Sequence, residues 1–269
     1  ANTDDFRLLA KKRLPRQLFD YIDGGSYQET TLSNNLSVFS SVHLRQRILR
    51  DVSSIDLSCN FLNKNRDMPI VLAPIGLAGC YARRGEQQAL NAASKANIPF
   101  CLSTVGICSI EELSAKSNKD FWFQLYVIKD RSFALKLLTR ARSAGCDTLV
   151  LTVDLPVLAE RYRDIRNGLS ASRESSKLIS KLKRGIDFAS HPRWLWDVAI
   201  KGKPLTFGNL LEAVPNARSL DDFKSWVDNQ FDASMTWQDI DWIRNNWPGT
   251  LIIKGILDSD DAIRAVKLG

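Results

Sequence analysis

The middle of the chain contains short apolar runs that are bounded by glycine, proline or aspartate. The runs are continuously apolar rather than alternating, which is typical of parallel strands that are buried on both faces. The pattern therefore predicts strands at residues 69–73, 98–102, 121–126, 148–153 and, after a long gap, 250–254.

Segments with apolar residues at helical spacing lie between these runs. The pattern predicts helices at residues 85–96, 109–116, 131–144, 236–246 and 259–268. Ser109 and Thr236 are each followed three residues later by an acidic residue, the capping box that begins many helices. Near the N-terminus, residues 4–23 have the same spacing, with a break at Pro15 and a stop at Gly24.

Alternating strands and helices predict right-handed βαβ units and a parallel sheet, which either closes as a barrel or stays open and doubly wound. Polar residues near the C-terminal ends of the strands favour the barrel, because that rim carries the chemistry of a TIM barrel. No Gly-x-Gly-x-x-Gly follows the first strand, which disfavours a dinucleotide-binding sheet. We therefore expect an α/β fold of the TIM (β/α)8 barrel type, incomplete, with about five of eight strand–helix units and an N-terminal helical extension.

The domain organisation follows from the same count. Five parallel strands would leave two open edges, and the chain stops where a sixth strand is expected. We expect residues 1–269 to form a single barrel domain that is truncated at its C-terminus. Residues 162–205 are expected to be an insertion after the fourth strand.

The insertion is basic and aromatic. Residues 161–204 contain 11 lysines and arginines against 4 acidic residues, so this stretch alone has a net charge of +7. Apolar residues recur at helical spacing between 178 and 186, and Trp194 and Trp196 follow. A basic amphipathic helix with nearby tryptophans indicates a peripheral membrane contact. A solvated loop that packs on its own domain is the alternative, and binding of nucleic acid lacks any supporting motif.

The amino-acid composition limits the class of protein but does not indicate a function. A content of 44% hydrophobic and 25% charged residues is ordinary for a globular protein. The five cysteines form no Cys-x-x-Cys pair, which favours reduced, mostly buried thiols in a cytoplasmic protein. His43 and His191 have no acidic or thiol neighbours at ligand spacing, so we expect no metal site.

Asp154 and Arg161 are the first candidates for chemistry. An aspartate at a strand end orients a base, and an arginine one loop later clamps an anion through its bidentate fork. A structural salt bridge within the loop explains the same spacing equally well.

Lys254 and Tyr126 also end apolar strands. A lysine buried there needs a role or a partner. One alternative is that Lys254 forms a Schiff base, as in a barrel lyase. A second is that it places positive charge beside a flavin. A third is that it is a solvated lysine at the rim of the barrel without a catalytic role. Tyr126 either donates to a substrate oxygen or only packs.

A set of short motifs occurs in a fixed order along nearly the whole chain, from about residue 6 to residue 269. They are Leu14-Pro15, Asp20-Tyr21 with Gly24-Gly25, Leu72-Ala73-Pro74-Ile75-Gly76, Leu102-Ser103-Thr104, Trp122-Phe123-Gln124-Leu125-Tyr126, Leu151-Thr152-Val153-Asp154 and Ile253-Lys254-Gly255. Together they resemble the FMN-dependent 2-hydroxy acid oxidase and dehydrogenase family. Each motif is weak alone, but the ordered set is specific.

Three further segments, 44–49, 81–86 and 161–164, are most similar to the bacterial L-lactate dehydrogenases of this family, which are linked to a quinone or cytochrome. Residues 191–194 are similar to its membrane-associated mandelate dehydrogenases. The resemblance implies FMN-dependent oxidation of L-lactate to pyruvate, with mandelate or another L-2-hydroxy acid as the alternative substrate. It also implies a homo-oligomer in the cytoplasm, peripheral on the inner face of the cell membrane. Two alternatives to this function remain. The protein is either a Schiff-base lyase that uses Lys254 or an inactive fragment.

The resemblance also implies roles for individual residues. The backbone of Ala73, Pro74, Ile75 and Gly76 is expected to lie near N5 of FMN. The side chains of Ser103, Gln124 and Thr152 are expected to contact the edge of the flavin ring system. Lys254 is expected to lie near N1 and O2. Tyr21 and Arg161 are expected to hold the substrate carboxylate, and Tyr126 the hydroxyl. Asp154 is expected to stabilise an imidazolium on the catalytic histidine.

That histidine belongs to a His-Gly-Gly-Arg type motif after the sixth strand in the family. No such motif occurs in the sequence, and we expect it within about ten residues after Gly269, judged from usual strand lengths. Neither His43 nor His191 lies in a matching motif, so neither is expected to be the base.

Overall fold

The computed structural model describes residues 2–116, 120–157, 159–167, 185–215, 226–227 and 229–269. The chain divides into two compact units. Unit 1 consists of Ala1–Asp56 and Ala159–Lys201, and unit 2 of Leu57–Leu158 and Gly202–Gly269. Within the described ranges, no helix is long and apolar enough to cross a membrane.

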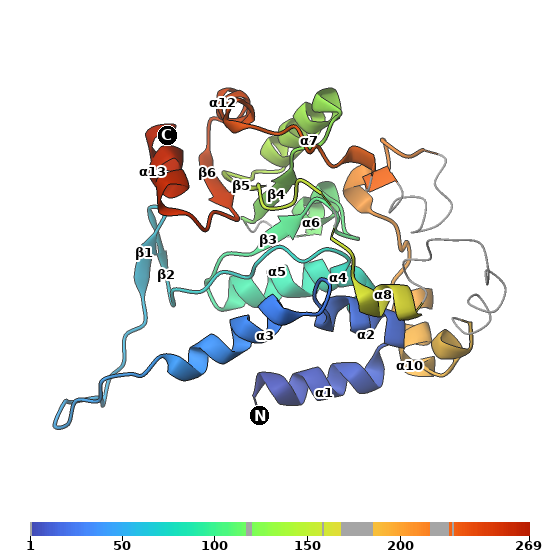
Figure 1. Ribbon diagram of the computed structural model, residues 1–269, viewed down its shortest axis with the longest axis horizontal. Helices are drawn as coiled ribbons and strands as arrows, with labels where there is room; N and C mark the ends of the chain where they lie inside the picture. The colour runs from blue at the N-terminus through green and yellow to red at the C-terminus, as the bar shows by residue number, and fades with distance from the viewer. Residues whose placement is uncertain (1, 117–119, 158, 168–184, 216–225, 228) are drawn as a thin grey trace. The chain divides into compact units, whose positions relative to one another are not determined.

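Unit 2 contains a four-stranded parallel sheet in the order β3 (Cys101–Ser103), β4 (Trp122–Tyr126), β5 (Thr148–Thr152) and β6 (Thr250–Lys254) (Figure 1). Four of the five predicted strands are therefore confirmed, although β3 begins later than expected. The prediction of a strand at 69–73 is wrong. Only Leu72 pairs there, in a single parallel bridge to Phe100, because Pro69 and Pro74 lack the N–H groups that would extend the ladder.

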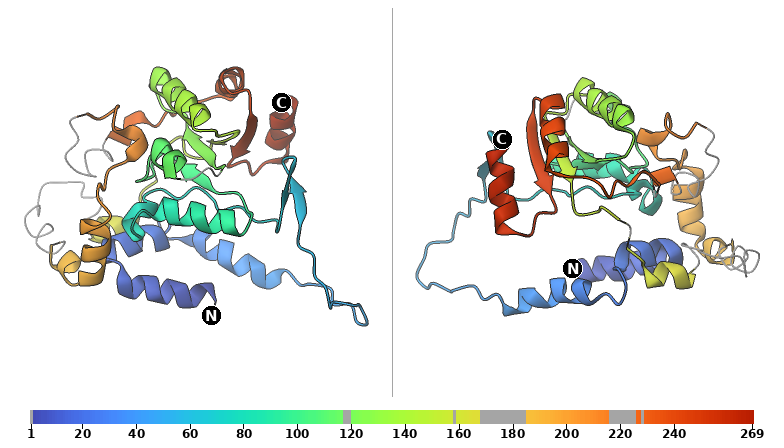
Figure 2. Two further views of the ribbon diagram at one scale, coloured as in Figure 1. Left: turned by 180° about the vertical axis from the view of Figure 1, so that it is seen from behind. Right: turned by 45° about the horizontal axis from the view of Figure 1, so that its top comes forward.

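The five predicted helices of unit 2 are confirmed within a residue or two. They are α5 (Gly85–Lys95), α6 (Ile110–Lys116), α7 (Arg131–Ser143), α12 (Trp237–Asn246) and α13 (Ser259–Lys267). The capping box of Thr236 is present, and Ser109 Oγ accepts a hydrogen bond from Glu112 N at 3.1 Å. The parallel strands alternate with helices along the chain, and α5 comes after the Leu72 bridge, as in part of a TIM barrel with four strands instead of the expected five (Figure 2).

One element of unit 2 was not predicted. β1 (Cys59–Phe61) and β2 (Lys64–Arg66) form an antiparallel hairpin. Its turn residues Leu62 and Asn63 have φ of 52° and 59°, as a two-residue hairpin turn requires. Leucine is not a turn former, so the local sequence gives no hairpin signal. Lys64 Nζ lies 2.6 Å from Asp120 and 2.7 Å from Asp147. Unit 2 also contains the short helices α4 (Ala78–Tyr81) and η3 (Gly208–Leu210).

Unit 1 is helical. Its first helices, α1 (Thr3–Arg13) and α2 (Arg16–Asp23), confirm the predicted break at Pro15 and the stop at Gly24. Unit 1 also contains α3 (Thr30–Ser37), η1 (Val38–Ser41), α8 (Tyr162–Asn167), α10 (Pro192–Trp194) and the π-helix η2 (Leu195–Ile200). The amphipathic stretch predicted at 178–186 lies mostly outside the described residues. The expectation of a single domain with an insertion at 162–205 stays a prediction.

One face of the sheet is apolar in the middle of the strands and polar near their C-terminal ends. Cys101, Trp122 and Val150 are buried together, with Val71 and Ile252 packed against them. Because side chains alternate along a strand, residues two positions further on lie on the same face, toward the C-terminal ends of the strands. Those residues are Ser103, Gln124, Thr152 and Lys254. The sheet thus places four of the predicted cofactor residues side by side.

Candidate functional site

A row of hydrogen bonds crosses the strand ends of unit 2. Ser103 Oγ donates to Gln124 Oε1 at 3.1 Å, and Gln124 Nε2 donates to Thr152 Oγ1 at 2.9 Å. All three side chains are buried. Thr104 adds to the row, since its N–H donates to Gln124 Oε1 at 3.3 Å and its Oγ1 donates to Gln124 O at 2.6 Å. Gln124 is the hub of this polar row, which we define as Ser103, Thr104, Gln124 and Thr152.

Lys254 extends the polar row with a positive charge. It is the register partner of Thr152 on the edge strand β6. Its Nζ lies 3.4 Å from Asp154 Oδ2, and the two side chains are 43% and 45% exposed. Lys254 is thus partly exposed, as in the rim-lysine alternative that the sequence left open, and it lies on the edge strand of the described sheet. A Schiff-base lysine must lose its proton, usually by burial or through a cationic neighbour. An exposed lysine beside a carboxylate has neither.

Gly255 brings the ends of β5 and β6 together. Its φ is +109°, and a Cβ built on it would lie 2.5 Å from Asp154 Cβ. Only glycine adopts this conformation and tolerates this approach without strain. The Ile-Lys-Gly motif is therefore explained by the placement of Asp154 next to Lys254.

The segment Ala73–Gly76 borders the loop that follows β3. Ala73 and Ile75 are exposed, whereas Pro74 and Gly76 are partly buried. Gly76 lies so close to Val105 that a Cβ would be 2.8 Å from Val105 Cγ2. Leu77 N donates to Val105 O at 3.0 Å, which fixes the two loops to each other.

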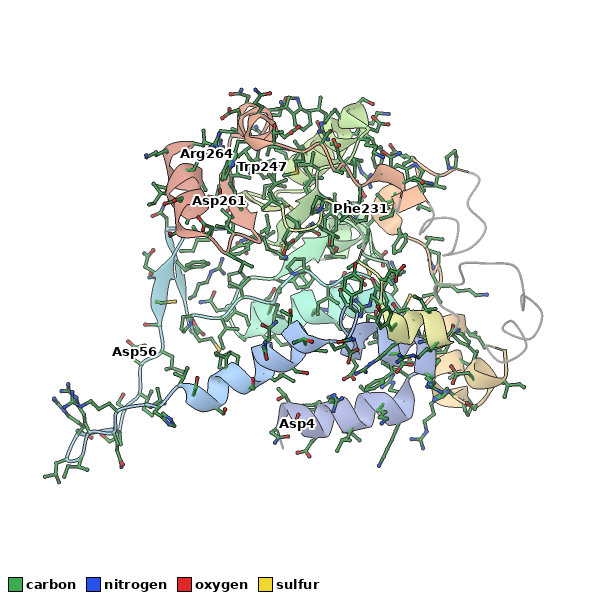
Figure 3. All side chains as sticks on the ribbon, viewed as in Figure 1. Asp4, Asp56, Phe231, Trp247, Asp261 and Arg264 are labelled. Carbon is green, nitrogen blue, oxygen red and sulfur yellow. The ribbon has the colours of Figure 1, made fainter. Side chains whose placement is uncertain are left out.

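A mostly apolar cavity of about 450 Å³ begins at the ends of β4, β5 and β6. Tyr126 lines it, and its ring meets Phe231 edge-on with centroids 5.6 Å apart. Phe231 and Asp261, both labelled in Figure 3, contribute to the lining from the chain before α12 and from α13. Trp237 adds a third aromatic side chain. The cavity is therefore lined mainly by apolar side chains, with the phenol of Tyr126 at one end of β4.

Arg161 and Tyr21 come together in unit 1. The Arg161 guanidinium lies over the Tyr21 ring, 4.7 Å from its centroid. Its Nη2 donates to the carbonyl oxygens of Tyr21 and Gly24, the latter at 2.7 Å, and its Nε lies 3.1 Å from Asp164 Oδ2. In the part of the chain that the structure describes, Nη1 makes no hydrogen bond. The ion pair of Arg161 is thus with Asp164, three residues on, and one edge of its fork remains for an anion.

Two buried polar side chains that the sequence did not single out hold the loop after β3. Glu86 Oε1 accepts from Gly79 N at 3.1 Å and from Ile107 N at 2.7 Å. Asn209 is completely buried, and its side chain donates a hydrogen bond to Ser103 O, about a hundred positions earlier in the chain. A glutamate in the first turn of a helix is usually a solvated partner of the helix dipole, so its position gives no signal of this role.

Most of the thiols are buried and are poor nucleophiles. All five cysteines are free, and four of them are buried, as expected. Burial, with a smaller contribution from nearby carboxylates, raises the pKa of Cys80, Cys108 and Cys146 to about 12. A thiol with so high a pKa is not a nucleophile at neutral pH.

The family model described as FMN-dependent dehydrogenase matches residues 10–269. The chain belongs to the FMN-dependent dehydrogenase family. It is 46% identical over 269 residues to the L-lactate dehydrogenase of Actinobacillus pleuropneumoniae serotype 3 (strain JL03), covering 100% of this chain and 69% of the relative. It is 47% identical to the L-lactate dehydrogenase of Caulobacter vibrioides (strain NA1000 / CB15N), with the same coverage. Among solved structures, the monotopic membrane protein (S)-mandelate dehydrogenase matches with a TM-score of 0.90 and 36% identity, over 100% of this chain and 69% of that one.

The polar row of this FMN-dependent dehydrogenase fits the cofactor of its family. Thr152 accepts through Oγ1 and so keeps its own O–H as a donor, and Gln124 Nε2 keeps a second N–H. Lys254 supplies a cation on the same face of the sheet. Donors and a positive charge are what a flavin ring with oxygen and nitrogen atoms along its edge requires.

Proposed function

We propose that this protein oxidises L-lactate to pyruvate and passes the two electrons to a quinone or cytochrome. Similarity to the L-lactate dehydrogenases supports the substrate. The polar row with Lys254 beside it is the observation that carries the redox chemistry. When bound, FMN accepts the electrons that leave the α-carbon of the substrate.

Unit 2 would hold the cofactor. Ser103, Gln124 and Thr152 would hydrogen-bond the edge of the flavin ring, with the backbone of Ala73–Gly76 near N5. Lys254 would lie near N1 and O2, where its charge offsets negative charge on the reduced ring. The free donors of Gln124 and Thr152 support this arrangement.

The substrate would be held through its two oxygen-bearing groups. Following the roles that the family resemblance implies, Arg161 would bind the carboxylate through the unused Nη1 edge, with Tyr21 beneath the guanidinium. Tyr126 would donate to the hydroxyl oxygen. Asp154 would stabilise the protonated form of the histidine base that the family resemblance implies.

Mandelate is the second candidate substrate. The similarity to (S)-mandelate dehydrogenase and the aromatic lining of the cavity beside Tyr126 favour it. A cavity of about 450 Å³ also has room for a phenyl group. L-lactate is preferred because the lactate dehydrogenases are the more similar relatives.

Steady-state oxidation of L-lactate, D-lactate and (S)-mandelate with a soluble quinone analogue tests the proposal. The flavin-loaded protein is expected to have its highest kcat/KM with L-lactate. Arg161→Lys keeps the charge but loses the planar fork, so it should raise KM more than it lowers kcat. Turnover of none of the three acids by flavin-loaded protein would contradict the proposal.

We also propose that unit 1 makes a peripheral contact with the inner face of the cell membrane. Trp196 is 57% exposed, as are more than half of Ile186 and Ile200. Lys201 Nζ lies 4.9 Å from the centroid of the Trp196 ring. An exposed tryptophan beside a cation suits the interface of an anionic bilayer.

Sedimentation with vesicles that contain anionic lipid tests this contact. Trp196→Ser combined with Ile200→Ser should reduce the bound fraction, whereas Val38→Ser, at another exposed apolar position of unit 1, should not. Equal binding by all variants would contradict the proposed surface.

A further inference from the structure

Asn209 uses all of its side-chain amide to hold the loop after β3. It lies in η3, about a hundred residues further along the chain than the groups it contacts. Its Oδ1 accepts from Ile110 N at 2.8 Å. Its Nδ2 donates to Ser103 O at 3.2 Å and to Thr104 O at 3.3 Å. A fully buried amide with both donors and its acceptor engaged fixes the backbone on which it acts.

The backbone of Asn209 is itself held in place. Gly208 N donates to Gly106 O at 3.2 Å, and a Cβ on Gly208 would lie 2.6 Å from Ser109 N, so the two segments are in close contact. Arg140 Nη1 donates to Asn209 O at 2.9 Å. The same arginine forms a two-pronged ion pair with Glu111 at 2.7 and 2.9 Å. Asn209 therefore cannot move without breaking contacts to α6 and α7.

The two residues that Asn209 holds by their carbonyls are those that contact Gln124 by their side chains. Ser103 Oγ donates to Gln124 Oε1, and Thr104 Oγ1 donates to Gln124 O. A shift of the Ser103–Thr104 backbone would thus move both donors relative to Gln124. The polar row depends on a side chain that does not itself belong to it.

We propose that Asn209 is a positioning residue for the flavin site, which sets the place of Ser103 and, through it, of Gln124. The inference rests on the proposed role of the polar row in binding FMN. A purely structural role would affect folding alone. A positioning role also changes the affinity for FMN and the spectrum of the bound flavin.

Asn209→Asp is the main variant, because it keeps the shape of the side chain and the acceptor for Ile110 N but places an acceptor against two carbonyls. The Kd for FMN is expected to rise about ten-fold, equivalent to about 1.4 kcal/mol, with a shift of the visible bands of the bound flavin. The KM for L-lactate in FMN-saturated protein should change less than two-fold, because the side chain of Asn209 hydrogen-bonds the backbone of Ser103, Thr104 and Ile110, which are not proposed to bind the substrate. Arg140→Met removes the hydrogen bond to the backbone of Asn209 together with the ion pair to Glu111, but keeps the Asn209 side chain. It should change the Kd in the same direction by a smaller factor.

Two controls separate positioning from loss of stability. Asn246→Asp makes the same chemical change at an exposed site on α12, where Nδ2 donates to Trp242 O. Ile243→Ala opens a cavity at a fully buried position of the same helix and lowers the melting temperature without removing any hydrogen bond of Asn209 or of the polar row. Both should bind FMN with wild-type affinity at a temperature where they are folded.

The inference is overturned if folded Asn209→Asp binds FMN with unchanged affinity and spectrum, or if Ile243→Ala weakens FMN binding as much. Failure of the wild-type protein to bind FMN would instead overturn the proposed function, so the two failures are distinguishable.

Discussion

Replacement of Gln124 by methionine is the most direct test of the polar row. The side chain is 1% exposed and makes three hydrogen bonds, which join Ser103 Oγ, Thr104 N and Thr152 Oγ1. Gln124→Met keeps a similar length but removes the acceptor and the donor. The change therefore isolates the hydrogen bonds from the packing.

The expected loss follows from these contacts. Three buried hydrogen bonds at about 1 kcal/mol each give about 3 kcal/mol, and the Thr104 N–H left without an acceptor adds about 1 kcal/mol. A loss of about 4 kcal/mol is a large part of the about 5–15 kcal/mol that stabilises a typical protein. At about 2–4 °C per kcal/mol for a chain of this size class, the melting temperature should fall by about 8–16 °C.

Thermal unfolding followed by circular dichroism, with and without FMN, measures this loss. Gln88→Met is the matched control, because Gln88 is an exposed glutamine on α5, and it should melt within about 2 °C of the wild type, since surface changes of this kind cost little. FMN should also stabilise Gln124→Met less than it stabilises the wild type. A melting temperature of Gln124→Met equal to that of Gln88→Met would refute the hydrogen-bonded row.

Three further predictions concern the neighbouring elements. Gly255→Ala should lower the urea midpoint of unfolding, because a φ of +109° and a Cβ 2.5 Å from Asp154 Cβ impose strain of about 1–3 kcal/mol; an unchanged midpoint would refute the strain. Lys254→Met should slow flavin reduction by L-lactate in anaerobic rapid mixing, yet change stability by only about 0–1 kcal/mol because the ion pair is exposed; an unchanged reduction rate would count against its role. The Arg140 hydrogen bond lowers the pKa of Glu111 to about 2 from a usual 4.5, so its stabilisation is present above pH 4.5 and is lost as the pH falls toward 2. Glu111→Gln should flatten the pH dependence of urea stability in that window, and an identical slope in both proteins would contradict this.

The strands and helices of unit 2 were predictable because their signals are local. A continuously apolar run and a capping box are read from a few neighbouring residues. The polar row was also predictable in part, since strands of similar length in a parallel sheet place their final polar residues at one edge. The position of Gln124 between Ser103 and Thr152 follows from the strand order.

Other features depend on contacts that are distant in sequence. Nothing in the sequence around Asn209 indicates its role. The role becomes visible only in the fold, which brings Asn209 against Ser103, about a hundred positions earlier in the chain. The sequence spacing allows either a catalytic role for Asp154 and Arg161 or a salt bridge between them, and in the structure the ion-pair partner of Arg161 is Asp164. The apolar run at 69–73 forms only one bridge, because prolines remove the donors that a longer ladder needs. Tertiary geometry, rather than the local pattern, decides each of these cases.

If this FMN-dependent dehydrogenase oxidises L-lactate, the substrate must reduce its bound flavin. A visible absorption spectrum of the purified protein, recorded before and after anaerobic addition of L-lactate, measures that reduction. We expect flavin bands that bleach with L-lactate and remain with D-lactate. Flavin bands that stay unchanged with L-lactate, or a flavin-loaded protein that bleaches only with another hydroxy acid, would show that L-lactate is not the substrate.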